Sequence, residues 1–272
     1  MKSDGRRYPS PMSTPTLADL EDLARQAGEI LRAGFGRRQQ IYRKGAIDLV
    51  TETDHRAEAF LIQEILRRFP GHRIVAEESG HTQGAECCVW YIDPLDGTVN
   101  FAHGLPIFSV SIGYAECGAT RLGVVYDPTR DECFSAERGS GAWLNGLPIH
   151  VSTASDLDQS LLVTGFAYDI RTNPQNNLDF YTQFSLQSLG VRRLGSAALD
   201  LCYVAAGRVD GYWELRISPW DVAAGGLIAE EAGARVSTIS GGGDYITPPC
   251  SILAAAPAVH SQMLEVLLSR SS

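Results

Sequence analysis

Apolar residues recur at helical spacing along much of the chain. Residues 17–35 place leucine, isoleucine and alanine on one face and charge on the other, after Thr16, a residue type favoured at helix N-caps. Residues 58–69 repeat the pattern, which stops at Pro70-Gly71. Later helices are predicted at residues 178–189, 197–206, 220–232 and 258–269.

Strand patterns alternate with these helices. Residues 88–92 form a continuous apolar run that predicts a buried strand ending before Asp93. Residues 108–114 alternate between apolar and small polar side chains, which predicts a strand with one buried face, and residues 121–126 are its expected hairpin partner. Asn145-Gly146 is a strong hairpin-turn signal. Further strands are predicted at residues 73–76, 133–136, 141–144, 161–165, 191–194 and 212–215, near residue 235, and at 252–255.

The order of these elements predicts a layered, mixed α and β protein. We expect a flexible tail over residues 1–15 and one folded region over residues 16–272. That region divides into halves of about 16–150 and 151–272, without a clear linker between them.

Composition narrows the possible partners. The chain has 272 residues, and its 32 acidic and 23 basic residues give a net charge of −9, which argues against a nucleic-acid-binding surface. No apolar segment approaches membrane-spanning length, and the polar N-terminus lacks the apolar run of a secretory signal. We therefore expect a cytoplasmic protein without nucleic-acid or membrane partners.

The chain has six cysteines, none of them in a C-x-x-C pair. They are Cys87, Cys88, Cys117, Cys133, Cys202 and Cys250. Because most lie in apolar stretches, we expect reduced thiols rather than a disulfide framework or a zinc site. Cys87 and Cys88 are expected to be core residues rather than catalysts.

The run WYIDPLDGTVNF, residues 90–101, combines two carboxylates with a glycine turn. Asp93 and Asp96 follow the predicted strand, and Gly97-Thr98 comes next. Carboxylate oxygens suit Mg²⁺ or Mn²⁺, and the backbone N–H groups of such a turn suit phosphate. Asp, Pro and Gly also dominate ordinary turns, so the motif alone fits a plain Asx-rich turn equally well.

Other polar residues lie at the ends of predicted elements. Glu77 ends a strand, where a surface carboxylate is ordinary; Asp54 and Asp221 lie at helix starts, where each fits an N-cap. Lys44 fits a solvated side chain. Taken together, the carboxylates can meet at one place, where they would repel and raise one another's pKa unless cations lie between them. The combined pattern predicts a metal cluster.

Two long motifs carry a resemblance to a known family. Residues 90–114 (WYIDPLDGTVNFAHGLPIFSVSIGY) and 219–236 (PWDVAAGGLIAEEAGARV) resemble the signature motifs of the inositol monophosphatase family of Mg²⁺-dependent, lithium-sensitive phosphatases. DLVTETD, AEES and GSAALD match three weaker family segments, and the resemblance runs from about residue 17 to the last helix. It implies the αβαβα layered sandwich shared with fructose-1,6-bisphosphatase, and a homodimer.

The resemblance also implies a ligand set for two or three Mg²⁺ ions, which Mn²⁺ could replace. Glu77, Asp93 and the Leu95 carbonyl would hold the first ion. Asp93, Asp96 and Asp221 would hold the second, and a weaker third would lie near Glu77 and bound waters.

Catalysis and phosphate binding are implied for neighbouring groups. The Gly97 and Thr98 amides would bind the phosphate. Glu77 and the Thr98 hydroxyl, supported by Asp54, would orient and deprotonate the attacking water. Phosphate monoesters hydrolyse extremely slowly without a catalyst, and their transition state places charge on the phosphoryl, attacking and leaving oxygens, which suits such a centre.

The substrate contacts implied by the resemblance lie in the second half. The alcohol would meet Asp96, the Gly195-Ser196-Ala197 segment and Glu214. Ser218 stands where animal members carry a histidine that contacts substrate, so we expect a bacterial-type enzyme of broad specificity. Lys44 and Ser218 are candidate supporting residues.

Three readings of the function remain open. The first is hydrolysis of inositol 1-phosphate and related polyol or sugar phosphates. Fructose-1,6-bisphosphatase or histidinol-phosphatase activity fits the same scaffold. A mainly regulatory binding protein is the third, and retention of Glu77, Asp93, Asp96 and Asp221 argues against it as the sole role.

Overall fold

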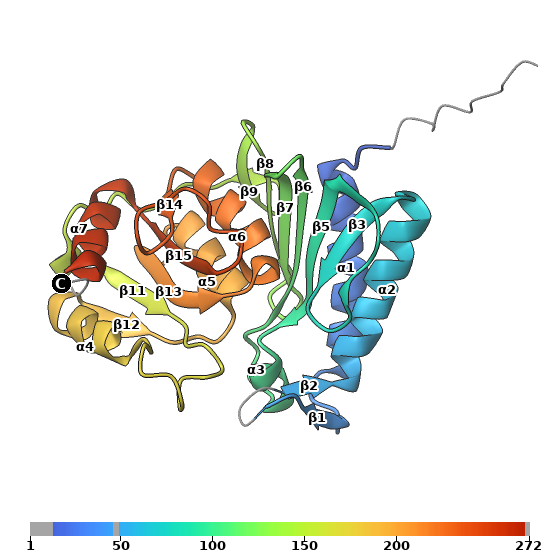
Figure 1. The fold of residues 1–272 in the computed structure, drawn as a ribbon, viewed down its shortest axis with the longest axis horizontal. Helices are drawn as coiled ribbons and strands as arrows, with labels where there is room; N and C mark the ends of the chain where they lie inside the picture. The colour runs from blue at the N-terminus through green and yellow to red at the C-terminus, as the bar shows by residue number, and fades with distance from the viewer. Residues whose placement is uncertain (1–12, 46–48, 270–272) are drawn as a thin grey trace, which may run out of the picture.

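The computed structural model describes residues 13–45 and 49–269, which form five alternating layers of helices and sheets (Figure 1). Helices α1 (Leu17–Gly34) and α2 (Glu52–Arg68) cover the outer face of an eight-stranded sheet. Helices α5 (Ala197–Ala205) and α6 (Pro219–Glu231) lie between that sheet and a five-stranded one, which α4 (Leu178–Gln187) and α7 (Pro257–Leu268) cover on the far side. The predicted αβαβα sandwich is confirmed.

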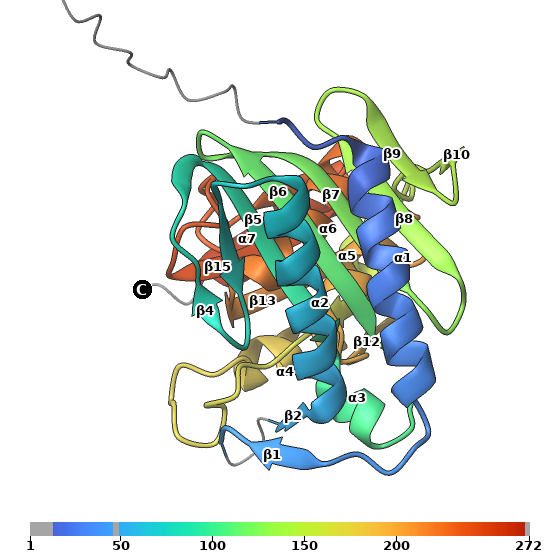
Figure 2. The ribbon, with the colours of Figure 1, turned by 90° about the vertical axis from the view of Figure 1, so that its right-hand side faces the viewer.

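The larger sheet has the order β10-β9-β8-β7-β6-β5-β3-β4 (Figure 2). Its strands are β3 (His72–Ala76), β4 (Gly80–His81), β5 (Ala85–Asp96), β6 (Ser109–Glu116), β7 (Ala119–Asp127), β8 (Glu132–Glu137), β9 (Gly141–Leu144) and β10 (Leu147–Pro148). Only the β3–β5 pair is parallel among these described strands. Strand β5, an interior strand of this sheet, carries the first carboxylate motif at its end.

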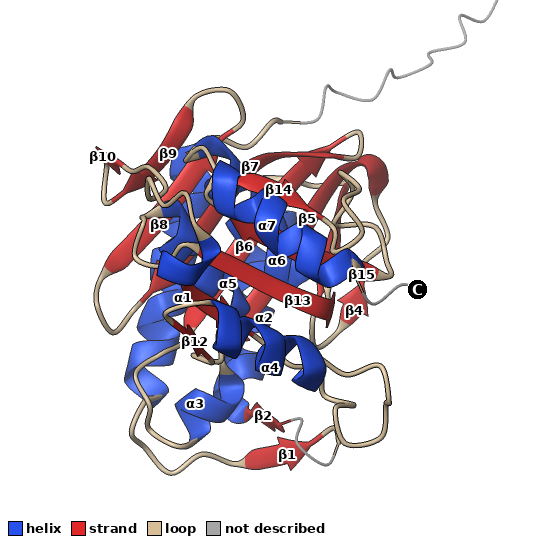
Figure 3. Ribbon diagram, turned by 90° about the vertical axis from the view of Figure 1, so that its left-hand side faces the viewer, coloured by secondary structure: helices blue, strands red, loops and turns tan. Residues whose placement is uncertain are grey.

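The smaller sheet has the order β12-β11-β13-β15-β14 (Figure 3). Its strands are β11 (Leu161–Thr164), β12 (Gly190–Arg192), β13 (Gly211–Ile217), β14 (Arg235–Ser237) and β15 (Cys250–Ala255). The shorter elements are the hairpin β1 (Ile41–Arg43) and β2 (Leu49–Thr51), helix α3 (Thr98–Ala102) and the 3₁₀ turn η1 (Leu157–Gln159). None of the described helices is long and apolar enough to cross a bilayer.

Strand β6 corrects one expectation, because both of its faces are buried. Its alternating small residues face a second helix layer rather than solvent. A Cβ on Gly113 would lie 2.9 Å from the Ala223 Cβ of α6, and the Ser111 hydroxyl donates to the Trp220 carbonyl across 3.1 Å. Small side chains here allow α6 to pack closely on the sheet.

Element boundaries also differ from the prediction at two places. Helix α2 begins at Glu52 rather than residue 58, because Thr51 is its N-cap. Strand β5 continues through Asp93 to Asp96, with an irregular register against β6 between these two residues. The predicted Asn145 turn is confirmed, with a positive φ of 50° at that residue. The predicted tail falls mostly on residues 1–12, outside the described part of the chain.

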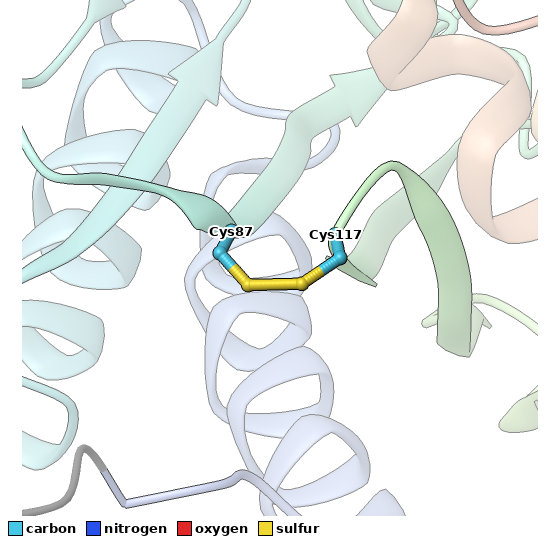
Figure 4. The surroundings of a disulfide bond; sticks show 2 residues. All are labelled: Cys87 and Cys117. Carbon is cyan, nitrogen blue, oxygen red and sulfur yellow. A yellow bond between two sulfur atoms is a disulfide. The ribbon is translucent and has the colours of Figure 1, made fainter.

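A disulfide between Cys87 and Cys117 overturns the expectation that all six cysteines are thiols (Figure 4). Cys87 lies near the start of β5 and Cys117 in the β6–β7 turn, and the Cys117 amide donates to the Cys87 carbonyl. Both residues are exposed, so Cys87 is not a core residue; Cys88, Cys133, Cys202 and Cys250 are buried free thiols. Residues 30 positions apart are adjacent here because the hairpin returns the chain to β5.

Candidate active site

Nearly every predicted site residue lines one pocket, which has a volume of about 550 Å³. This volume is typical of small-molecule sites. The predicted residues that line the pocket are Lys44, Glu77, Asp93, Leu95, Asp96, Gly97, Thr98, Gly195, Ser196, Ala197, Glu214, Ser218 and Asp221. Asp54 is not among the lining residues; it is fully buried and contacts Thr98.

Asp93 lies deepest among the carboxylates at the end of β5. It is 2% exposed, and its Oδ1 accepts a hydrogen bond from the Leu95 amide across 2.9 Å. Burial raises the pKa of Asp93 well above its usual range, and the nearby charges of Glu77, Asp96 and Asp221 raise it further. These carboxylates are therefore close enough to repel one another.

Asp96 joins β5 to the N-terminus of α5. Its carboxylate accepts hydrogen bonds from the Ser196 hydroxyl at 2.6 Å, the Ala198 amide at 2.8 Å and the Ala197 amide at 3.2 Å. Such donors stabilise the carboxylate form, yet burial still leaves the pKa of Asp96 raised. The contact fixes the two halves of the chain against each other at the pocket.

Asp221 enters the pocket from the first turn of α6. Ser218, not Asp221, is the N-cap of this helix, and Asp221 completes the capping box by accepting from the Ser218 amide at 3.0 Å. Burial, followed by the charges of Asp96 and Glu77, raises the pKa of Asp221 well above its usual range. Capping alone therefore does not account for a carboxylate held among like charges.

Glu77 lies directly after β3, next to Lys44. The Lys44 ammonium is 3.4 Å from Glu77 Oε1 and 2.5 Å from Glu78 Oε1. Burial raises the pKa of Glu77 to about 7, although the lysine charge opposes the shift. Glu58 holds this turn, because its carboxylate accepts hydrogen bonds from the Glu78 and Ser79 amides at 2.8 and 2.9 Å. The sequence analysis did not identify Glu58; the only indication in the sequence was an acidic residue within the apolar pattern of α2.

Asp54 is not the N-cap that its sequence position suggested: Thr51 is the N-cap, and Asp54 is the third residue of α2. Its Oδ2 accepts from the amide and hydroxyl of Thr51 at 2.9 and 2.5 Å, which completes the α2 capping box. Its Oδ1 accepts from the Thr98 hydroxyl at 2.9 Å. Burial raises the pKa of Asp54 despite these donors.

Gly97 requires glycine for two reasons. Its φ of +99° is in the left-handed region, and a Cβ there would lie 2.9 Å from the Ile107 carbonyl oxygen. The turn therefore brings its backbone to the pocket wall without a side chain.

Glu214, on β13, also lines the pocket. It is 7% exposed, and its Oε2 accepts a hydrogen bond from the Tyr212 hydroxyl at 2.6 Å. Burial raises the pKa of Glu214 to about 7, and the charge of Arg193 opposes the shift. A Cβ on Gly165 would lie 2.0 Å from Glu214 Oε2, so the glycine leaves room for the carboxylate.

The donor chemistry of this cluster fits a hard divalent cation. Glu77, Asp93, Asp96 and Asp221 offer carboxylate oxygens, and Leu95 offers a carbonyl, the ligand types that Mg²⁺ prefers. Their mutual repulsion is what a cation would relieve.

The chain is similar to known proteins over most of its length. The model of the inositol monophosphatase family matches residues 13–271. A Synechocystis protein named inositol-1-monophosphatase is 48% identical over 248 residues, covering 89% of this chain and 84% of the relative. The Escherichia coli K12 protein named Nus factor SuhB is 44% identical, covering 92% and 94%. The inositol monophosphatase structure from Anabaena (Nostoc) aligns with a TM-score of 0.82 at 44% identity, covering 92% and 93%.

Proposed function

This chain belongs to the inositol monophosphatase family, and we propose that it is a Mg²⁺-dependent phosphomonoesterase acting on inositol 1-phosphate and related polyol or sugar phosphates. The observation that carries the proposal is the cluster of four repelling carboxylates, Glu77, Asp93, Asp96 and Asp221, on one pocket. A network built only for stability would pair such buried charges with cations of its own.

The proposed metal ligands are those that the family resemblance implies. Glu77, Asp93 and the Leu95 carbonyl would hold one Mg²⁺, and Asp93, Asp96 and Asp221 another; a third would lie near Glu77, and Mn²⁺ is a possible substitute. Bound Mg²⁺ supplies positive charge against the phosphoryl oxygens and lowers the pKa of water.

The remaining groups have roles of their own in the proposal. Thr98 donates its hydroxyl hydrogen toward Asp54, so the lone pairs of its oxygen are available to accept a hydrogen bond from the attacking water and aim it. Glu77 would receive the proton that the attacking water loses. The Gly97 and Thr98 amides would bind the phosphate.

The alcohol would lie toward the second half of the chain. Glu214, Ser218 and the Gly195–Ala197 segment line that part of the pocket.

Fructose-1,6-bisphosphatase and histidinol-phosphatase activity are the alternatives on the same scaffold. A panel of inositol 1-phosphate, fructose 1,6-bisphosphate and histidinol phosphate at fixed Mg²⁺, ranked by kcat/KM, separates them; we expect inositol 1-phosphate to rank first.

Relatives named Nus factor SuhB are 43–44% identical to this chain. They favour action as a Nus factor as a second candidate role. Our expectations of a cytoplasmic homodimer without nucleic-acid partners stay predictions.

Lithium inhibition, expected at the second metal position, is a further part of the proposal; insensitivity at high Li⁺ would count against it.

A further inference from the structure

The loop of residues 165–177 lies between the active-site pocket and a second, smaller cavity. It joins β11 to α4 and is the yellow segment between them in Figure 1. Residues of this loop and of β13 line the second cavity, which has a volume of about 10 Å³ and holds about one water. The pocket and the cavity are neighbours, because they share the lining residues Gly165, Phe166, Ala167, Asp169, Glu214 and Arg216.

The loop is fixed at its ends and little buried between them. The side-chain amide of Asn177, which is 4% exposed, donates to the Thr164 hydroxyl at 2.7 Å and to the Gly165 carbonyl at 2.8 Å. The Trp213 indole donates to the same side chain at 2.7 Å. None of residues 165–176 is buried. A segment with so few buried contacts opens more readily than the core beside it.

An ion pair joins β13 to this loop. Arg216 Nη2 donates to Asp169 Oδ1, and both side chains, 40% and 42% exposed, line the pocket and the cavity. The hydrogen bond from Arg216 lowers the pKa of Asp169, so the carboxylate is ionised near neutral pH. The amides of Thr172 and Asn173 donate to the Asp169 carbonyl at 2.9 Å. The ion pair therefore holds a whole turn of the loop against β13.

Glu214 relates this ion pair to the substrate. It lies on β13, as Arg216 does, and it lines both the pocket and the cavity. In the proposed function the alcohol lies toward Glu214. A group that extends beyond this carboxylate on the cavity side therefore meets the Asp169–Arg216 pair, and separation of the pair would join the cavity to the pocket.

We propose that the Asp169–Arg216 pair determines the size of the alcohol that the enzyme accepts. Compact polyol and sugar phosphates bind with the pair formed, whereas esters of larger alcohols, such as phosphorylated disaccharides, require it to open. The inference rests on the proposed phosphatase function and deepens it by naming the substrate class. Asp169 and Arg216 are specificity-determining residues and take no part in breaking the ester bond.

The test compares glucose 6-phosphate with trehalose 6-phosphate, which carries the same phosphorylated glucose and a second ring. Each ester competes with inositol 1-phosphate at fixed Mg²⁺, and the release of inositol is measured, so the competitor need not be hydrolysed. The readout is the inhibition constant of glucose 6-phosphate divided by that of trehalose 6-phosphate. Both esters carry the same charge, so changes in phosphate binding cancel in this ratio.

Asp169→Asn and Arg216→Met each remove the charge of one partner at nearly constant side-chain size. We expect the ratio to rise about 1.5- to 5-fold in each variant, the factor by which an exposed ion pair shifts an equilibrium, because a ligand that needs the open loop binds in proportion to the open population. A smaller rise in either variant, or no competition by trehalose 6-phosphate, overturns the proposal.

Salt distinguishes the ion pair from a wall that acts only through its shape. Salt screens exposed charges, so the wild-type ratio should rise with the concentration of NaCl, whereas the ratio of Arg216→Met should stay constant. A wild-type ratio that does not respond to salt overturns the role of the ion pair.

Asp131→Asn is the matched control. Asp131 pairs with Arg25 at 3.1 Å, the two side chains are 70% and 43% exposed, and neither lines the pocket. Its ratio should equal that of wild type at each salt concentration. Failure of the phosphatase proposal looks different, since wild type would then release no inositol from inositol 1-phosphate, and the size selection would fail with it.

Discussion

The Thr98 hydroxyl donates a hydrogen bond to the Asp54 carboxylate across 2.9 Å. The bond joins the first residue of α3 to the first turn of α2, where Asp54 also completes the capping box with Thr51. One buried carboxylate thus fixes a helix end and the direction of the hydroxyl at the pocket wall.

This contact predicts coupled effects on turnover. Thr98→Val removes the hydroxyl that would aim the water, and we expect kcat to fall roughly 100-fold or more with a smaller change in KM. Asp54→Asn should reduce kcat less, because the hydroxyl remains.

Steady-state kinetics of the two single variants and the double variant test the coupling. The double variant should be little worse than Thr98→Val, since the residues act as one unit. Losses that multiply fully would show that they act independently.

Asp93→Asn is expected to separate activity from stability. Asp93 is the carboxylate that both proposed metal positions share, so we expect kcat/KM to fall by at least about 100-fold. The thermal midpoint of the metal-free protein should rise, because one of the repelling buried charges is removed. The increase in midpoint on adding Mg²⁺ should shrink, and near-normal turnover in this variant would contradict the metal assignment.

Gly97→Ala is expected to destabilise the fold and weaken phosphate binding. The left-handed backbone costs about 1–2 kcal/mol for an alanine, and the clash with the Ile107 carbonyl adds to it. Gly139→Ala is the control, because its φ is +83° but nothing lies within 4 Å of its Cβ position. Chemical denaturation should show a larger loss for Gly97→Ala; equal losses would mean that the close approach does not matter.

His260 predicts a loss of stability in mild acid. It is fully buried in α7 beside the Ser237 hydroxyl at 2.9 Å, and burial lowers its pKa from 6.5 to about 4. Because the unfolded chain binds a proton near pH 6.5 and the folded chain only near pH 4, stability is full above pH 6.5 and falls between these values. The contribution of His260 to the change from pH 7 to pH 5 is a loss on the order of 2 kcal/mol. Glu77 and Glu214, whose pKa values are raised to about 7, contribute in the opposite direction, so the His260 contribution is read from the difference between wild type and variant.

Urea denaturation at the two pH values measures this effect. His260→Asn should reduce the difference between them, although buried His72, whose pKa is also lowered, keeps part of it. His81→Asn, at an exposed position, is the control and should leave the difference as in wild type. An unchanged difference in His260→Asn would contradict the assignment.

The sequence was most informative where local chemistry and long motifs coincide. The run from Trp90 to Phe101 places Asp93 and Asp96 at the end of a buried strand, and both line the pocket in the structure. Periodicity also predicted the layered order of helices and strands. These features depend on residues that are close together in the chain, so a single sequence is enough to predict them.

The remaining features depend on tertiary packing. Ser111 and Gly113 suggested a solvent-facing side of β6, yet a second helix layer covers it, because small residues suit close packing as well as exposure. The Cys87–Cys117 disulfide depends on where a hairpin returns.

The most direct test of the central claim is phosphate release from inositol 1-phosphate by the wild-type protein with and without Mg²⁺. We expect release that depends on Mg²⁺ and stops when a chelator removes it. No release from this ester, or from any other polyol, sugar or histidinol phosphate, at any Mg²⁺ concentration would contradict the account.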